Sequence, residues 1–310
     1  MDYIEQADGI LQHFGAPAER FMPNNELKKK CLEYDLHMAQ AQLKHLGTDA
    51  NFETMRKMAA FLKEHVTILT DTDVTDVDKA AHTVHYEGKG VQDSVTAEHT
   101  SLPSAVGSRF LPNGVSKRYS AEKQPVDIGV RVELPSMVWD DFSHKIYEPK
   151  IWYRSKQYGD VTRMFCFNER GQVVMENTSG VLTVNGHAYV DEAKKSQNSN
   201  FALLSTIRFT EPFKEPIEYA RSVAGLANLI SGGSVLVQRL GDLMNGRRTD
   251  EKRLRQSTTR PTLNAVPGDL SLCLPKRQLD NILETLQALD AISPGTANYD
   301  TLLYGIECKY

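Results

Sequence analysis

The sequence has little of what marks membrane, secreted or nucleic-acid-binding proteins. No apolar run approaches the roughly 20 residues that a membrane-spanning helix requires, and the opening stretch MDYIEQADGILQHFG is acidic where a secretory signal is basic. The formal net charge of -4 has the wrong sign for a protein that binds nucleic-acid phosphates. We therefore expect a cytoplasmic protein that binds neither a membrane nor a nucleic acid.

Cysteine is scarce, and its spacing excludes further classes of protein. The 310 residues include 4 cysteines, none of which belongs to a CxxC pair: Cys31, Cys166, Cys273 and Cys308. This spacing fits neither a cysteine-ligated zinc centre nor a disulfide framework. We expect a protein of a reducing compartment, without a metal site.

The motif GxGxxG is absent as well, although the chain has 20 glycines. Residues 24–86 have the order of helices and strands that suits one part of a dinucleotide-binding domain. The phosphate-binding element of that domain is a strand, a glycine-rich turn and a helix whose N-terminus faces the pyrophosphate. The sequence therefore fits such a domain without its phosphate-binding beginning.

Two helices followed by strands are predicted in this segment. The first helix is capped by Asn24 or Asn25 and ends at Gly47. The second covers 48–65, and its apolar face consists of Phe52, Met55, Ala59 and Leu62. The apolar run 66–69 and the alternating residues after it predict consecutive strands.

From residue 126 the pattern changes to β-structure. VDIGVRVELP alternates apolar residues with Arg131 and Glu133, which predicts a strand with one polar face. KIWYRSKQY, VTRMFCFN and GQVVMEN predict further strands of a mostly antiparallel sheet, with NERG as a hairpin turn. Helices are predicted from Glu215 and Pro275, and VLVQRLGDLMNGRRT passes from a strand into a helix.

Several segments, in this order, resemble the successive motif blocks of the NAD(FAD)-utilizing dehydrogenase family, a group of FAD-dependent oxidoreductases. They are VDIGVRVELP, TVNGHAY, SNFALL, FTEPF, VQRLGDLMNGRRT, RPTLNAVPGDLSLCLPKR and PGTANYDTLLYGIE. The resemblance implies an α/β (α+β) fold. A partial FAD-binding, Rossmann-like segment over 1–122 would be followed, over 123–310, by a mixed, mostly antiparallel sheet domain with packed helices.

The resemblance also implies an FAD cofactor and a longer protein. Family members begin with a strand and glycine-rich turn that hold the FAD pyrophosphate, and they end with a GDGAG-like segment that closes over the flavin. We expect this chain to lack both, through truncation or because another polypeptide supplies them. SLPSAVGSRF is a poor copy of the family's glycine-rich loop, which leaves cofactor contacts from Ser104 to Ser108 in question.

In such a flavoenzyme the sheet domain covers the isoalloxazine ring and offers polar side chains to a small-molecule substrate. The resemblance implies Asn185 and Asn200 as substrate contacts, with a glycine between Asn185 and His187 that lets the backbone approach the ligand. His187 would be the catalytic acid or base, since histidine exchanges a proton near neutral pH. Arg131 and Arg163, on neighbouring predicted strands, are expected to clamp a carboxylate or a phosphate.

Glu133 completes the expected substrate contacts, and the implied cofactor contacts are Thr48, Asp49 and Val74. Thr48 and Asp49 belong to HLGTD, which matches a family block, yet they are also an ordinary helix N-cap.

Ordinary structural roles compete with these assignments. Asn185 followed by Gly186 is a type I′ turn signal, which suits His187 as a turn residue bonded to the backbone. Arg131 and Glu133, two residues apart on the same face, equally suit cross-strand pairing with Arg163. In VQRLGDL, the polar side chains are expected to fix the start of a helix, and the basic run GRRTDEKRLR fits a solvated face or a last helical turn.

Two functions remain open on the sequence. The chain is part of an FAD-dependent oxidoreductase that acts on an unknown small molecule, or it is a non-catalytic ligand-binding or interaction module that no longer binds FAD.

Overall fold

The structure is a computed structural model that describes residues 2–40, 42–101, 125–178, 180–210, 212–213 and 215–309. The chain divides into two compact units, Met1–Arg56 with Pro125–Lys309 and Lys57–Gln124. We expected a different kind of division, in which 1–122 belongs to an FAD-binding domain and 123–310 to a substrate domain. These assignments stay a prediction. The questioned contacts from Ser104 to Ser108 lie outside the described residues.

The larger unit is built on an eight-stranded sheet. Its strands, in sheet order, are β1 (Leu36–Met38), β6 (Ile151–Arg154), β7 (Val161–Asn168), β10 (Asn198–Ile207), β5 (Val126–Pro135), β13 (Leu302–Lys309), β11 (Leu236–Arg239) and β12 (Val266–Pro267). Neighbours pair antiparallel except β11 and β12, which run parallel. A separate antiparallel hairpin consists of β8 (Gln172–Thr178) and β9 (Val181–His187). The expected α+β fold with a mixed, mostly antiparallel sheet is confirmed.

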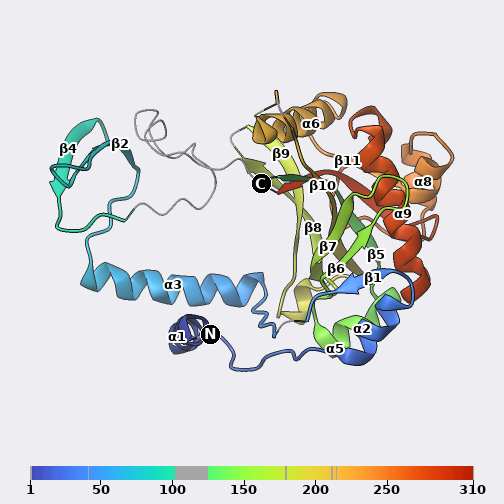
Figure 1. The fold of residues 1–310 in the computed structure, drawn as a ribbon, viewed down its shortest axis with the longest axis horizontal. Helices are drawn as coiled ribbons and strands as arrows, with labels where there is room; N and C mark the ends of the chain where they lie inside the picture. Colours follow the sequence, from blue (N-terminus) through green and yellow to red (C-terminus); the bar gives the residue numbers. More distant parts are fainter. Residues whose placement is uncertain are drawn as a thin grey trace. The chain divides into compact units, whose positions relative to one another are not determined.

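Most helices of this unit supply buried residues to the core beside the sheet, and the N-terminal helix, as far as it is described, supplies none (Figure 1). The helices of the unit are α1 (Asp2–His13), α2 (Asn25–Leu32), α5 (Asp140–Ile146), α6 (Pro216–Ile230), α7 (Leu240–Met244), α8 (Glu251–Gln256) and α9 (Lys276–Ile292). Short 3-10 turns lie at Ser136–Val138, Glu192–Lys194 and Leu270–Leu272. The apolar stripe predicted for α9 is buried at Ile282, Leu286 and Leu289, so the 3.6-residue period identified the core face of this helix correctly.

Strand β5 lies between β10 and β13 and is buried on both faces. The predicted polar face is present, but it does not face solvent, because Arg131 and Glu133 are completely buried. The hairpin of β8 and β9 lies over that face: a Cβ placed on Gly186 of β9 would be 3.0 Å from Cζ of Arg131. The alternation of VDIGVRVELP thus separates an apolar core from a buried polar layer.

The first predicted helix is much shorter than expected. Asn24 does cap α2, since its side chain accepts a hydrogen bond from the N–H of Leu27 at 3.0 Å. The helix ends at Leu32, Asp35 takes a left-handed φ of 58°, and the chain continues as β1, which pairs with β6. Pairing with a strand more than a hundred residues away decides this segment, and local helical preference cannot predict it.

The second predicted helix, α3 (Thr48–His65), forms as expected. The predicted apolar face is not buried, however. Phe52, Met55 and Leu62 are exposed, and Thr54 is the buried residue of the helix. Helical periodicity located the helix but not its buried side.

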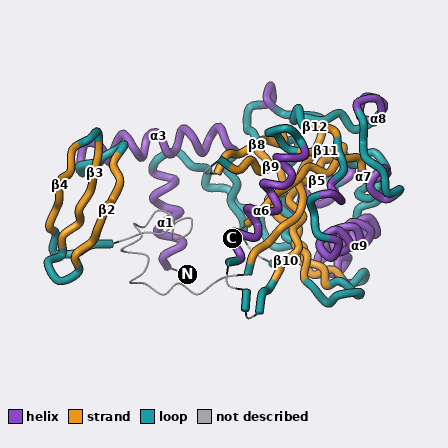
Figure 2. Tube along the Cα trace, turned by 90° about the horizontal axis from the view of Figure 1, so that it is seen from above, coloured by secondary structure: helices purple, strands orange, loops and turns teal. Residues whose placement is uncertain are grey.

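The smaller unit contains a three-stranded antiparallel sheet of β2 (Thr72–Asp78), β3 (Thr83–Gly88) and β4 (Val91–Thr96), drawn together in Figure 2. Consecutive strands were predicted here, but the apolar run 66–69 forms no strand. The implied Rossmann-like character of 1–122 stays a prediction. In the ranges that the structure describes, no helix combines the length and the apolar character needed to cross a bilayer.

Candidate functional site

A cavity of about 660 Å³ in the larger unit is rimmed by the arginines Arg154, Arg163, Arg208 and Arg277. Strands β6 and β7, the end of β10 and the start of α9 supply these side chains. Val161, Ile207 and Phe209 add apolar surface to the wall. The volume lies in the range of small-molecule binding sites, which makes this cavity the candidate functional site.

The strand period explains how two of the arginines reach the rim. Arg154 ends β6, whose alternate residues Ile151 and Tyr153 are buried, and it donates a hydrogen bond to the carbonyl of Gly159 at 2.8 Å. Arg163 lies on β7 between buried residues and forms an ion pair with Asp127 of β5. Both guanidinium groups therefore project from the sheet on the side that lines the cavity.

Helix α9 supplies the third arginine. The Nε and Nη2 atoms of Arg277 each donate to Asp160 at 2.6 Å, and Asn281 donates to the same carboxylate at 2.9 Å. The hydrogen bonds from Arg277 hold the pKa of Asp160 below its usual value. This pair fixes the α9 side of the rim.

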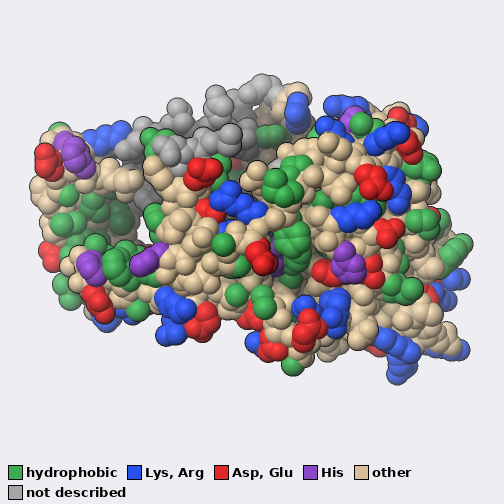
Figure 3. Space-filling view, turned by 90° about the horizontal axis from the view of Figure 1, so that it is seen from below, with side chains coloured by type: hydrophobic (Ala, Val, Ile, Leu, Met, Phe, Trp, Pro, Cys, Tyr) green, Lys and Arg blue, Asp and Glu red, His purple; other side chains and the backbone are tan. Residues whose placement is uncertain are grey.

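Arg208 differs from the other three. It follows β10, is exposed, and has no carboxylate partner among the described residues. Figure 3 shows acidic and basic side chains interspersed over one face of the molecule. The rim keeps free hydrogen-bonding capacity at this arginine.

Arg131, Asn185 and Asn200, predicted as substrate contacts, do come together, but in the interior rather than at the cavity. Arg131 donates to the Asn185 side chain at 2.6 Å and to the carbonyl of Cys166 at 2.9 Å. Its Nε lies 3.1 Å from a carboxylate oxygen of Glu307, and both side chains are buried. Burial raises the pKa of Glu307, and the positive charge of Arg131 opposes that rise.

Asn200 of β10 accepts a hydrogen bond from Asn168 at 3.2 Å beside this pair. Gly186 packs against both amides and Arg131, and a Cβ there would lie 2.5 Å from Nδ2 of Asn168. Close approach is thus the role of Gly186, as expected, but the groups that approach it are side chains of the chain itself.

Glu133 belongs to an adjoining buried group. It accepts hydrogen bonds from the hydroxyls of Tyr304 and Thr262, both at 2.5 Å, and burial raises its pKa. Burial also raises the pKa of Tyr304 well above its usual value. These contacts join β5, β13 and the loop that contains Thr262. The role of Glu133 as a substrate contact stays a prediction.

Two geometric expectations for these residues are wrong. Arg131 and Arg163 are not on neighbouring strands, because β10 lies between β5 and β7. Asn185 and Gly186 do not form a turn: they lie within β9, and the hairpin closes between Thr178 and Val181. The predicted NERG hairpin is also absent, since it joins β7 to β8 and these strands pair with others.

His187 ends β9 and makes an edge contact with Tyr189, with ring centroids 6.3 Å apart. It does not line the cavity. Its catalytic role stays a prediction that the cavity does not support.

Thr48 and Asp49 tie the start of α3 to the segment after β9. The N–H of Thr48 donates to the carbonyl of Ala188 at 2.8 Å, and the Asp49 carboxylate accepts from the N–H groups of Val190 and Asp191, both at 3.0 Å. These bonds, the one from Val190 first, lower the pKa of Asp49 to about 2. Val74 lies in β2 of the other unit. That Thr48, Asp49 and Val74 contact a cofactor stays a prediction.

The Asp49 contact predicts a pH dependence of stability. Because the folded-state pKa is lowered, the stabilisation is present above the unfolded value and is lost as the pH falls towards about 2. Asp49→Asn should therefore lower the melting temperature at neutral pH, and the difference from the unmodified chain should shrink as the pH drops below about 4. Glu53→Gln on the same helix is the control, and an equal effect of both changes would contradict this assignment.

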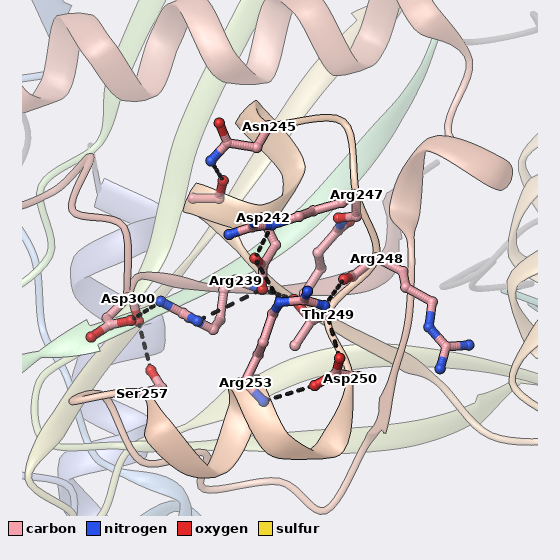
Figure 4. Close-up of polar contacts among 12 residues, drawn as sticks. Arg239, Asp242, Asn245, Arg247, Arg248, Thr249, Asp250, Arg253, Ser257 and Asp300 are labelled. Carbon is pink, nitrogen blue, oxygen red and sulfur yellow. Dashed lines mark hydrogen bonds and ion pairs between the residues drawn. The ribbon is translucent and has the colours of Figure 1, made fainter.

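A second polar cluster surrounds Asp242 (Figure 4). This buried carboxylate accepts from Nε of Arg247 at 2.8 Å and from the Thr249 hydroxyl at 2.9 Å, and Arg239 bridges to Asp300 at 2.6 Å. Buried Gln238 accepts from the N–H of Leu270 at 2.8 Å in the same region. These contacts tie β11 and α7 to the segment that follows α7. Arg239, at the N-cap of α7, makes no side-chain capping hydrogen bond, so the expectation that Gln238, Arg239 and Asp242 fix the start of this helix is not confirmed.

The same cluster accounts for the basic run GRRTDEKRLR. Arg253 and Arg255 lie in the last turn of α8, one of the two expected placements.

In another part of the larger unit, ligand atoms of Asp140, His144 and Glu169 lie within 4.8 Å of one another, an arrangement that could hold a metal ion. An ion pair of 3.1 Å between His144 and Glu169 accounts for this approach, and the expectation of no metal site is not tested by it.

Sequence reasoning missed Arg154, Arg208 and Arg277. Arg154 and Arg208 lie outside the motif blocks, and Arg277 ends the block RPTLNAVPGDLSLCLPKR without having been singled out there. Each is an isolated arginine at the end of a predicted strand or the start of a predicted helix. A clustering of arginines at element ends was the available signal, but only the strand order shows which ends meet.

Comparison with known proteins agrees with the resemblance at a coarse level. The family model described as FAD-dependent protein, C-terminal domain-like matches residues 125–310, which include the cavity and the buried network. A search of curated proteins finds no match. Because the match covers more than half of the chain, this protein belongs to the family of FAD-dependent proteins with this C-terminal domain.

Proposed function

We propose that the chain is part of an FAD-dependent oxidoreductase, a dehydrogenase, in which the larger unit is the substrate-side domain. The observation that carries the proposal is the arginine-rimmed cavity, which lies entirely within the residues that match the flavoprotein family. Its volume suits a small molecule and its rim suits an anionic group. The substrate is accordingly a small molecule with a carboxylate or a phosphate.

The residues of the cavity also fit the groups of a flavin nucleotide. Guanidinium groups are the usual partners of phosphate oxygens, and Val161, Ile207 and Phe209 offer apolar surface to a ring. When bound, FAD supplies the hydride chemistry of the reaction. The arginines would bind and orient an anionic ligand, while the buried ion pair of Arg131 and Glu307 links β5 to β13 in the interior of the same unit.

Flavin retention tests this proposal. The purified chain is incubated with excess FAD and desalted, and its absorbance spectrum is recorded. We expect a retained yellow flavin band, which would justify a search for dehydrogenase activity and for substrates. A colourless protein would show that this chain does not hold FAD by itself, and the non-catalytic ligand-binding module would then be the better description.

A further inference from the structure

The charges around the cavity are unequally matched. Arg163 is paired with Asp127, and Arg277 is paired with Asp160. Arg154 donates to a backbone carbonyl, and Arg208 has no acidic partner within the described ranges. Among the residues that the structure describes, two of the four guanidinium groups therefore have no carboxylate partner.

A phosphate monoester carries a charge of about -1.5 to -2 near pH 7 and presents three strong acceptor oxygens. A single carboxylate would balance only one of the two free guanidinium groups. Arginine forks bind phosphate oxygens in a bidentate manner, and paired arginines keep further N–H groups for a second acceptor. We propose that this cavity binds a phosphate group of a small-molecule ligand, with Arg208 and Arg154 as its principal partners.

A neutral donor at the wall supports this assignment independently of the charges. Gln278, at the start of α9, lines the cavity with only 5% of its surface exposed. Its side-chain amide makes no hydrogen bond to any residue that the structure describes. Because this amide lines the cavity, its N–H groups can donate to an acceptor oxygen of a ligand there.

The rest of the cavity indicates what carries the phosphate. The volume of about 660 Å³ exceeds what a bare phosphate fills, and the side chains of Val161, Ile207 and Phe209 face this space. Phe209 is held by Phe213 and Tyr219, with ring centroids 4.4 Å and 5.1 Å away. The ligand is therefore a phosphate ester with an apolar or aromatic body.

This inference deepens the proposed function, because it rests on the cavity being the ligand site of that domain. The phosphate has two sources of the same chemistry: a phosphorylated substrate or the phosphates of the flavin nucleotide. The test separates them.

Isothermal titration of the full chain with inorganic phosphate, pyrophosphate, FAD and riboflavin measures phosphate recognition directly. Arg208→Ala is expected to weaken binding of the phosphate probes by about tenfold or more, as the loss of a charge-assisted hydrogen bond implies. Arg208→Lys, which keeps the charge but not the fork, should give an intermediate loss. Arg248→Ala is the matched control, since Arg248 is also exposed and points away from its cluster (Figure 4).

If Arg208→Ala weakens FAD but not riboflavin, the inference holds and the phosphate is that of the flavin. If phosphate and pyrophosphate binding are lost while FAD affinity is unchanged, it holds with a separate phosphorylated molecule as the ligand. Absence of phosphate and pyrophosphate binding by the unmodified chain, or equal losses in Arg208→Ala and Arg248→Ala, would overturn it. A retained flavin band in that last case would leave the proposed function standing.

Discussion

Replacement of Arg131 by methionine is expected to lower the free energy of unfolding by about 3–5 kcal/mol. The change removes the ion-pair partner that Glu307 has within the described part of the chain, while leaving that carboxylate buried, with a side-chain exposure of 1%. It also removes the donors to the Asn185 side chain and to the carbonyl of Cys166. Urea denaturation of the two proteins under identical conditions measures the difference.

The double variant Arg131→Met with Glu307→Leu is the control, because it removes both charges and should recover much of the loss. The pH dependence gives a second check. A raised folded-state pKa favours folding below the unfolded value, and this advantage is lost as the pH rises through the folded value. The deficit of the single variant should therefore shrink as the pH falls, and a loss below about 1 kcal/mol, the usual size for an exposed pair, would refute a buried ion pair.

The parts of the fold that local patterns decide were predictable from the sequence. The stripe of α9 has the helical period over a long segment, and its members Ile282, Leu286 and Leu289 are buried as that period requires. The cap at Asn24 was predictable for the same reason, since a cap depends on residues within one turn. The end of α2 was not, because β1 forms only through pairing with β6.

The candidate site shows the same division. The sequence indicated that Arg163 could bind an anion, and the structure places it on the cavity rim. It also paired Arg163 with Arg131, and this failed because β10 enters the sheet between β5 and β7 from a later part of the chain. Strand order is set by burial over the whole chain, so periodicity within one strand does not reveal which arginines become neighbours.

The buried polar layer was hidden by its residue types. Arginine and glutamate are seldom fully buried, so the polar face that Arg131 and Glu133 predicted for β5 gave no indication that other strands would cover it. The hairpin of β8 and β9 covers them, Glu307 of β13 forms an ion pair with Arg131, and the Tyr304 hydroxyl donates a hydrogen bond to Glu133. A buried polar layer of this kind restricts which strands fit together, since each partner must be met by hydrogen bonds.

Gly186→Ala is expected to cost about 1–3 kcal/mol of stability through overpacking. The new Cβ would lie 2.5 Å from Nδ2 of Asn168, closer still to Oδ1 of Asn200, and 3.0 Å from Cζ of Arg131. These side chains cannot turn away cheaply, because Asn168 and Arg131 both donate to the carbonyl of Cys166, each at 2.9 Å. Thermal and urea denaturation would show the loss.

Gly225→Ala provides the opposite expectation within the same unit. Gly225 lies in α6, has no positive φ, and a Cβ there would meet no atom within 4 Å. Alanine favours a helix interior over glycine by about 0.8–1 kcal/mol, so this variant should be slightly more stable than the unmodified chain. If Gly186→Ala proved equally harmless, Gly186 would not be needed for the close packing of β9 on β5. The dipeptide Asn185 and Gly186 would then owe its place in the strand to some other constraint.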